Sequence, residues 1–130
     1  MSGVFDPEPL FAAIDARDAD AFAAFLTEDA EFRFGNAPPV VGRPAIAAYC
    51  AAFFAGLGGL THRLESIWEV PEGVVCHGVV SYRRRDGSEL TVPFANVLYL
   101  ASDRVRRYLI FVDNGALFQG PVPARTLASG

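Results

Sequence analysis

Three polar side chains could do acid-base chemistry on a surface that is otherwise apolar: His62, Asn96 and Asp113. Each falls in an alternating stretch typical of a β-strand, so it shares a strand face with residues two positions away. The three expected faces are His62, Leu64, Ser66 and Trp68; Val92, Phe94, Asn96, Leu98 and Leu100; and Arg107, Leu109, Phe111 and Asp113. An imidazole and a carboxyl can each take up and return a proton, and an amide can hold a ligand oxygen. If the three faces line one concavity, they form a small-molecule site.

The side chains expected to contact the ligand are mostly aromatic. Trp68, Phe94 and Phe111 come from the strand faces, Tyr49 and Phe53 come from a helix, and Arg107 shares the face of Asp113. Walls of this kind favour a small, flat, apolar molecule over a sugar or a nucleotide.

Each candidate also has a purely structural interpretation. His62 can be a satisfied core residue, and Asn96 can pin a strand end or a bulge. Asp113 precedes Asn114 and Gly115, where an aspartate often closes a turn on its own backbone. A bulge in any of the strands would also reverse the faces beyond it.

The elements that position these residues change type near residue 60. Before it, apolar spacing and proline positions predict three helices: one beginning near Pro9, one capped by Asp18 and carrying Phe22, Phe25 and Leu26, and one opened by Gly42-Arg43-Pro44. A brief strand is expected at 31–34.

Beyond residue 60 the alternation predicts strands at 61–70, 73–85, 90–101 and 105–113, joined by hairpin-sized turns. Helices followed by a meander of strands is typical of an α+β domain in which one sheet curls over a helical layer. We expect one domain at 1–119 and a C-terminal tail at 120–130.

The last strand is apolar on both sides, as expected for a central strand or for a strand that a partner subunit covers. With the Asp113 row facing inward, the opposite row of Tyr108, Ile110 and Val112 lies outside. We therefore predict a homodimer formed through the sheet.

Composition excludes several other classes of protein. The chain has 130 residues, 52% of them hydrophobic, and a formal net charge of −4 with no lysine. Such a chain can bury a core, and it is a poor candidate for binding nucleic acid or an anionic membrane. Cys50 and Cys76 show no metal-ligand spacing, so neither a metal nor another cofactor is expected. No leader or long apolar run is visible, and we predict a cytoplasmic protein.

Residues 12 to 118 resemble the SnoaL-like branch of the nuclear-transport-factor-2-like (NTF2-like) superfamily. The matching pieces are Asp18-Ala19-Asp20-Ala21-Phe22, Leu26-Thr27-Glu28-Asp29-Ala30, Phe34-Gly35-Asn36-Ala37-Pro38-Pro39, Val41-Gly42-Arg43-Pro44-Ala45-Ile46, His62, Trp68, Pro93-Phe94-Ala95-Asn96-Val97 and 108–113. The resemblance implies an NTF2-like cone, with three N-terminal helices on a strongly curved antiparallel sheet that encloses a pocket.

The resemblance also implies cofactor-free acid-base chemistry, of the cyclase or isomerase type, on an apolar carbonyl compound. It places Asp113 at the position of a general acid or base, with His62 and Asn96 as its hydrogen-bonding partners. Two departures count against the activity of ketosteroid isomerase, a member of the same superfamily: Arg33 falls near the position of that enzyme's catalytic base, and the first helix has no tyrosine to donate to an oxyanion. The alternatives are a ligand-binding or accessory protein without turnover and a purely structural dimerisation module.

Overall fold

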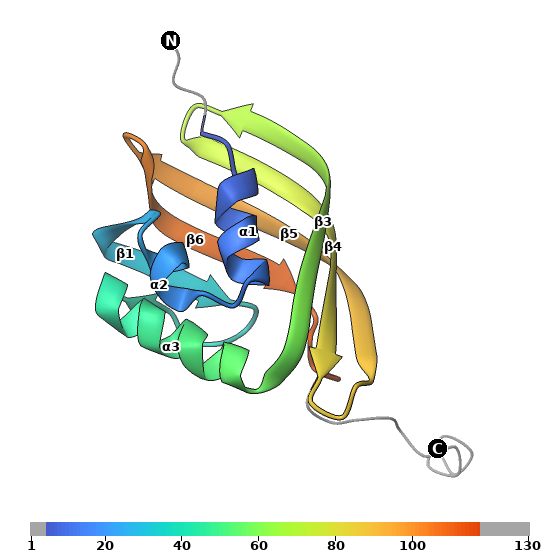
Figure 1. Cartoon of the computed structure of the whole chain (residues 1–130). Coiled ribbons are helices and arrows are strands. Elements are labelled where there is room, and N and C mark those ends of the chain that lie inside the picture. The colour runs from blue at the N-terminus through green and yellow to red at the C-terminus, as the bar shows by residue number, and fades with distance from the viewer. Residues whose placement is uncertain (1–4, 118–130) are drawn as a thin grey trace.

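The computed structural model describes residues 5–117, which form an α+β fold (Figure 1). Its helices are α1 (Glu8–Asp15), α2 (Ala19–Ala23) and α3 (Arg43–Ala55). Its strands are β1 (Leu26–Phe34), β2 (Val40–Val41), β3 (Leu57–Val70), β4 (Gly73–Arg84), β5 (Glu89–Ala101) and β6 (Arg104–Val112). The tail expected at 120–130 lies outside the described residues, so the domain boundary remains a prediction.

The strands form one curled sheet in the order β2-β1-β6-β5-β4-β3, with the helices on one face (Figure 1). Neighbouring strands are antiparallel except β1 and β6, which run parallel. The buried residues lie between the helices and this inner face, and the fully buried ones include Leu10, Ile46 and Tyr108. The α+β class and the cone-like arrangement that the sequence predicts are therefore confirmed. Within residues 5–117, no helix is long and apolar enough to cross a membrane.

Capping and proline residues place the helix starts close to where the sequence predicts them. Asp18 accepts a hydrogen bond from the backbone N–H of Ala21 at 3.0 Å, and Pro44 lies in the first turn of α3. The expected extent of α2 is wrong at its end, because the helix stops at Ala23 and Leu26 begins β1. Leu26 pairs with Val105 of β6 and is fully buried, so sheet pairing there overrides the helical spacing.

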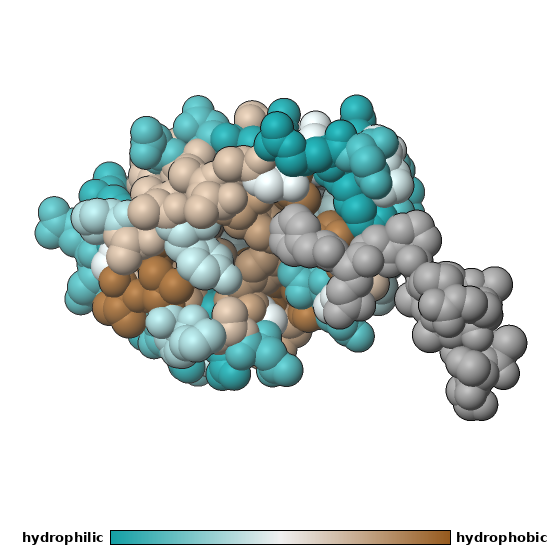
Figure 2. All heavy atoms as spheres, turned by 90° about the horizontal axis from the view of Figure 1, so that it is seen from below, coloured by the Kyte–Doolittle hydropathy of each residue, from teal (hydrophilic) through white to brown (hydrophobic). Residues whose placement is uncertain are grey.

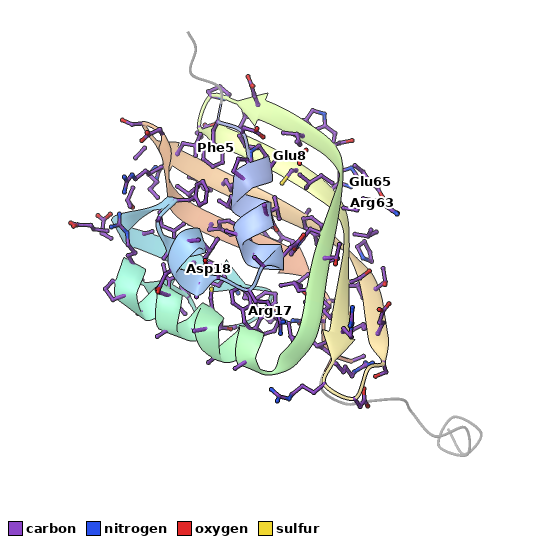
Figure 3. All side chains as sticks on the ribbon, in the orientation of Figure 1. Phe5, Glu8, Arg17, Asp18, Arg63 and Glu65 are labelled. Carbon is purple, nitrogen blue, oxygen red and sulfur yellow. The ribbon has the colours of Figure 1, made fainter. Side chains whose placement is uncertain are left out.

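A bulge in β3 reverses the expected face of Trp68. Leu64 pairs with Gly78, whereas Ser66 pairs with His77, so Glu65 is an extra residue on β3. His62 and Leu64 keep the inner face, but Trp68 lies outside, 51% exposed, with its ring stacked on His77 at 5.5 Å. Figure 3 shows Arg63 and Glu65 projecting from β3 away from the helices.

The expected inner row of β6 is also wrong, because the pairing of β6 with β5 places the other row inside. Directly opposed residues of antiparallel strands share a face, and Phe94, Asn96 and Leu98 of β5 oppose Val112, Ile110 and Tyr108 of β6. The row of Tyr108, Ile110 and Val112 is therefore inside. The row of Arg107, Leu109, Phe111 and Asp113 lies on the outer face, where Phe111 is 57% exposed. Because both rows are largely apolar, hydrophobicity could not distinguish them.

The close approach of β3 and β4 beside the bulge depends on Gly78. A Cβ atom added to this residue would lie 1.9 Å from the carbonyl oxygen of Arg63. Only glycine allows the two backbones to meet at this point. The bulge, and with it the position of His62 two pairs along the strand, thus depends on a missing side chain.

Candidate functional site

A cavity lies between the helices and the inner face of the sheet. Its volume, taken as the space that the centre of a water-sized sphere can reach, is about 50 Å³. Its lining consists of Ile14, Phe22, Phe32, Phe34, Tyr49, Cys50, Phe53, Phe54, Leu60, His62, Val80, Tyr82, Phe94, Asn96, Tyr108 and Ile110. Figure 2 views the molecule from below and shows apolar side chains in the middle of that face, with hydrophilic ones around them. The cavity suits a small apolar molecule with few polar groups.

His62 is held at the cavity by a carboxylate from α1. Its Nδ1 lies 2.6 Å from Oδ1 of Asp15, and its backbone N–H donates to Oδ2 of the same residue at 3.0 Å. Side-chain exposure is 12% for His62 and 27% for Asp15. The ring packs against Phe11 and meets Phe94 edge-on, with centroids 4.9 and 5.2 Å apart. The imidazole is thus fixed by two hydrogen bonds to one carboxylate and by two aromatic neighbours.

This geometry determines the tautomer of the neutral imidazole. An ionised carboxylate only accepts hydrogen bonds, so Nδ1 carries the proton that is shared with Asp15. Nε2 then keeps its lone pair, and it has no hydrogen-bond partner among residues 5–117. A histidine oriented in this way can accept a proton at Nε2, while the carboxylate stabilises the imidazolium that forms.

The turn between α1 and α2 positions the Asp15 carboxylate. Arg17 follows α1 with φ +56°, in the left-handed region, and its guanidinium donates to the carbonyl oxygen of Leu57 at 2.9 Å. Leu57 begins β3, so this bond ties the end of α1 to the strand that carries His62. Figure 3 shows Arg17 and Asp18 at this turn, close to where α3 leads into β3.

Asn96 and Tyr108 form a second polar group in the cavity wall. The Nδ2 of Asn96 donates to the Tyr108 hydroxyl oxygen at 3.0 Å, across the β5–β6 pair. Asn96 is 2% exposed, and its Oδ1 has no hydrogen-bond partner. A buried acceptor without a partner costs about 1–3 kcal/mol. Because Oδ1 has no partner in the protein, it is free to accept a hydrogen bond from a ligand in the cavity.

Burial keeps the thiols and phenols in and beside the cavity wall in their neutral forms. Burial raises the pKa of the Cys50 thiol to about 12 and that of Cys76 to about 11. Burial likewise raises the pKa of the phenols of Tyr82 and Tyr108. It also raises the pKa of Tyr49, and the charge of the neighbouring Cys50 raises that pKa further. These hydroxyls can donate hydrogen bonds at neutral pH, and the thiols are poor nucleophiles.

The structure brings together five of the nine side chains that the sequence singles out. His62, Asn96, Phe94, Tyr49 and Phe53 line the cavity. Trp68, Phe111, Arg107 and Asp113 do not, because the β3 bulge and the register of β6 place them on the outer face.

Asp113 adopts the turn that was its structural alternative, since its Oδ1 accepts from the backbone N–H of Gly115 at 3.1 Å. Arg107 lies 3.6 Å from the carboxylate of Glu31. The expected pairing of Asp113 with His62 and Asn96 is therefore wrong.

The sequence did not point to two residues that hydrogen-bond within the site, Asp15 and Tyr108. Asp15 ends a helix 47 residues before His62, and nothing local links the two. Tyr108 was expected on the outer face. It shares a row with Ile110 and Val112, and since the opposite row is also largely apolar, no pattern in the sequence showed that this row faces inward. No group of three or more His, Cys, Asp or Glu side chains among the described residues is arranged to hold a metal ion.

A family model for the SnoaL-like domain matches residues 8–108, which include Asp15, His62, Asn96 and all of the cavity lining except Ile110. The chain belongs to the SnoaL-like domain family. A comparison with curated protein sequences found no significant match.

Several solved structures are similar to this SnoaL-like domain. An NTF2-like protein from Burkholderia pseudomallei has a TM-score of 0.77 at 15% identity, covering 86% of this chain and 91% of the other. A protein from Jannaschia sp. CCS1 described as a SnoaL-like polyketide cyclase has a TM-score of 0.75 at 20% identity, with 88% and 90% covered. TerC, crystallised with polyporic acid, has a TM-score of 0.74 at 18% identity, with 86% and 92% covered. At these identities the likeness shows the shared fold.

Proposed function

We propose that this SnoaL-like domain is a cofactor-free enzyme that moves a proton on a small, apolar carbonyl compound, with His62 as the base. The observation that carries the proposal is the Asp15–His62 pair at the wall of an apolar cavity, with Nδ1 and Oδ1 2.6 Å apart. A carboxylate, an imidazole and a largely water-excluding pocket form a recurring arrangement for general base catalysis. The polyketide cyclase named among the similar structures supports this class of chemistry.

The reaction begins with loss of a proton from the carbon next to the carbonyl group. His62 Nε2 takes this proton, the C–H electron pair forms a C=C bond, and negative charge moves to the carbonyl oxygen. The Asp15 carboxylate stabilises the imidazolium, and the Tyr108 hydroxyl is the donor available to the oxygen. The imidazolium then returns the proton to carbon or oxygen, which completes an isomerisation or prepares the carbon for ring closure.

The proposal is tested by following exchange of the α-protons of 1-indanone in deuterated buffer by proton NMR. The chain should accelerate exchange above the buffer rate, and His62→Gln should reduce this acceleration about 100-fold. His77→Gln is the matched control, since His77 lies outside the cavity, and it should leave the rate unchanged. A wild-type rate equal to that of buffer, or a His62→Gln variant as fast as the parent, would overturn the assignment.

A ligand-binding protein without turnover is the second candidate function. It is favoured by the lining of the cavity, which among the described residues holds one imidazole, that of His62, and no carboxylate. In this case 1-indanone shifts resonances of cavity residues in an NMR titration, whereas its α-protons exchange no faster than in buffer.

We also propose that the outer sheet face forms a homodimer. Trp68 and Phe111 are more than half exposed there, at 51% and 57%, beside Pro93, Ala95 and Leu109. The face carries both Arg107 and Asp113, so a two-fold copy can supply the opposite charge to each. Light scattering at micromolar concentration should give twice the chain mass, and a monomer mass would contradict the proposal.

A further inference from the structure

We propose that Asn96 and Tyr108 form a recognition site for a hydroxyl group, so that the molecule this cavity binds best is a phenol or an enol. The inference rests on the proposed function in that it names the ligand class of the same cavity. Recognition itself requires no turnover, so the two can be tested separately.

The first argument is the buried amide oxygen. Oδ1 of Asn96 has no hydrogen-bond partner although the residue is 2% exposed and lines the cavity. Among the described residues, one other buried side-chain atom shares this condition, the Nε of Arg107, and it lies 3.6 Å from the carboxylate of Glu31. Asn96 has no such compensation, so its oxygen is an acceptor that a ligand can satisfy.

The second argument is the donor beside it. The Tyr108 oxygen accepts the hydrogen bond from Asn96 Nδ2, which leaves the hydroxyl hydrogen of Tyr108 without an acceptor among residues 5–117. Burial raises the pKa of Tyr108, with the nearby thiols of Cys76 and Cys50 adding to the effect, so the phenol remains protonated. The pair therefore offers the cavity one acceptor and one donor next to each other.

A hydroxyl group is the simplest functional group that satisfies both. Its hydrogen donates to Asn96 Oδ1, and its oxygen accepts from the Tyr108 hydroxyl. A ketone or ether oxygen can use the donor but places its lone pairs near Oδ1. A carboxylate meets no arginine or lysine in the lining, and a hydrocarbon uses neither group.

The rest of the ligand is defined by the neighbouring walls. Asn96 lies two residues from Phe94 on β5, about 7 Å along the strand, and the Phe94 ring meets the His62 ring at 5.2 Å. A single ring can therefore carry its hydroxyl to Asn96 and Tyr108 while its edge lies toward His62. In the proposed reaction, an enol formed from the carbonyl compound has this hydroxyl, whereas the starting ketone does not.

Three single-ring probes separate the contributions: phenol, toluene, in which a methyl group replaces the hydroxyl, and anisole, which keeps the oxygen but lacks the O–H. NMR titration of the full chain should show phenol binding at least 10-fold more tightly than toluene, with anisole weaker than phenol. Asn96→Leu should bring phenol and toluene within about 2-fold of each other. The control Ile110→Val changes only an apolar wall and should weaken all three probes equally.

Equal binding of phenol and toluene, no binding of any probe, or a preference that survives Asn96→Leu would overturn the inference. Equal affinities for phenol and toluene would mean that Asn96 and Tyr108 form hydrogen bonds only with water and not with the ligand. If Asn96→Leu fails to fold by circular dichroism, Tyr108→Phe keeps the ring and should remove most of the preference.

His62→Gln distinguishes this inference from the proposed function, because it should abolish proton exchange and retain the phenol preference. A phenol preference in a chain without exchange activity overturns the proposed function alone. Exchange activity without the preference overturns this inference alone.

Discussion

His62 and His77 lie on neighbouring strands of one sheet, but on opposite faces. His62 faces inward, shares a proton with Asp15 at 2.6 Å and lines the cavity. His77 faces outward, stacks on the exposed Trp68, and has no carboxylate partner among the described residues. The difference shows that a histidine becomes a candidate base through a carboxylate that fixes its tautomer and through aromatic side chains that pack against its ring. Here α1 supplies Asp15 and Phe11, and β5 supplies Phe94.

The same contrast holds for the two faces as a whole. The inner face buries its polar groups in pairs, Asp15 with His62 and Asn96 with Tyr108. The outer face carries Arg107 and Asp113 in partly exposed positions, one beside Glu31 and the other closing a turn. Charged groups on the outer face are solvated, so water screens their electrostatic effect on a bound molecule more strongly than it screens that of the paired groups inside.

The largest expected effect follows from the carboxylate partner of His62. Asp15→Asn keeps the size of the side chain, but its amide can donate to Nδ1 and favour the wrong tautomer. The rate of 1-indanone α-proton exchange should fall about 100-fold, roughly 3 kcal/mol in the barrier. Trp68→Ala is the matched change beside the other histidine and should leave the exchange rate unaltered. Equal effects of the two variants would remove the distinction between the faces.

The buried thiols of the inner side predict a loss of stability at alkaline pH. The pKa of Cys50 is raised from its usual value near 9 to about 12, so the folded state keeps a proton that the unfolded chain releases. This contribution is fully present below pH 9 and is lost as the pH rises toward 12, by at most about 4 kcal/mol. Urea unfolding between pH 8 and 10.5 should show falling midpoints. The Cys50→Ala variant should show a shallower fall, and an identical slope in both proteins would contradict the assignment.

The bulge that separates the faces depends on Gly78. Gly78→Ala adds a Cβ atom that would lie 1.9 Å from the Arg63 carbonyl oxygen. The variant should lower the free energy of unfolding by about 3 kcal/mol. Val79→Ala, on the outer face of the same strand, should cost about 1 kcal/mol. Chemical denaturation measures both values. A mild effect at Gly78 would mean that the two strands can separate there without loss of structure.

The smallest effect on folding is expected on the outer face. Phe111→Ser removes an aromatic ring that is 57% exposed and should change the stability of the single chain by no more than about 0.5 kcal/mol. If the outer face forms the dimer, the same substitution should shift light scattering toward the monomer mass. Retention of the dimer would place the interface elsewhere.

Local patterns in the sequence determined much of the fold. Proline and glycine positions placed α1 and α3 near their observed starts. Alternation predicted the four long strands with ends within one residue of those observed, except that β3 begins at Leu57 and not at residue 61. Asn96 and Phe94 were predicted on the inner face of β5 because that face of the strand is mostly apolar. The prediction is correct because the pairing of β5 with β4 has no bulge in this stretch. The cavity residues found in this way are those whose own strand or helix identifies their direction.

Tertiary structure alone decided the rest. One extra residue at Glu65 turned Trp68 outward, and the pairing of β6 with β5 turned Asp113 and Phe111 outward. Asp15 reached His62 across 47 residues because α1 packs over the curled sheet. Alternation determines which residues share a strand face but not which face is buried when both are apolar. A bulge of one residue also moves every side chain beyond it to the opposite face. Contacts between distant segments follow from packing, which no local pattern encodes.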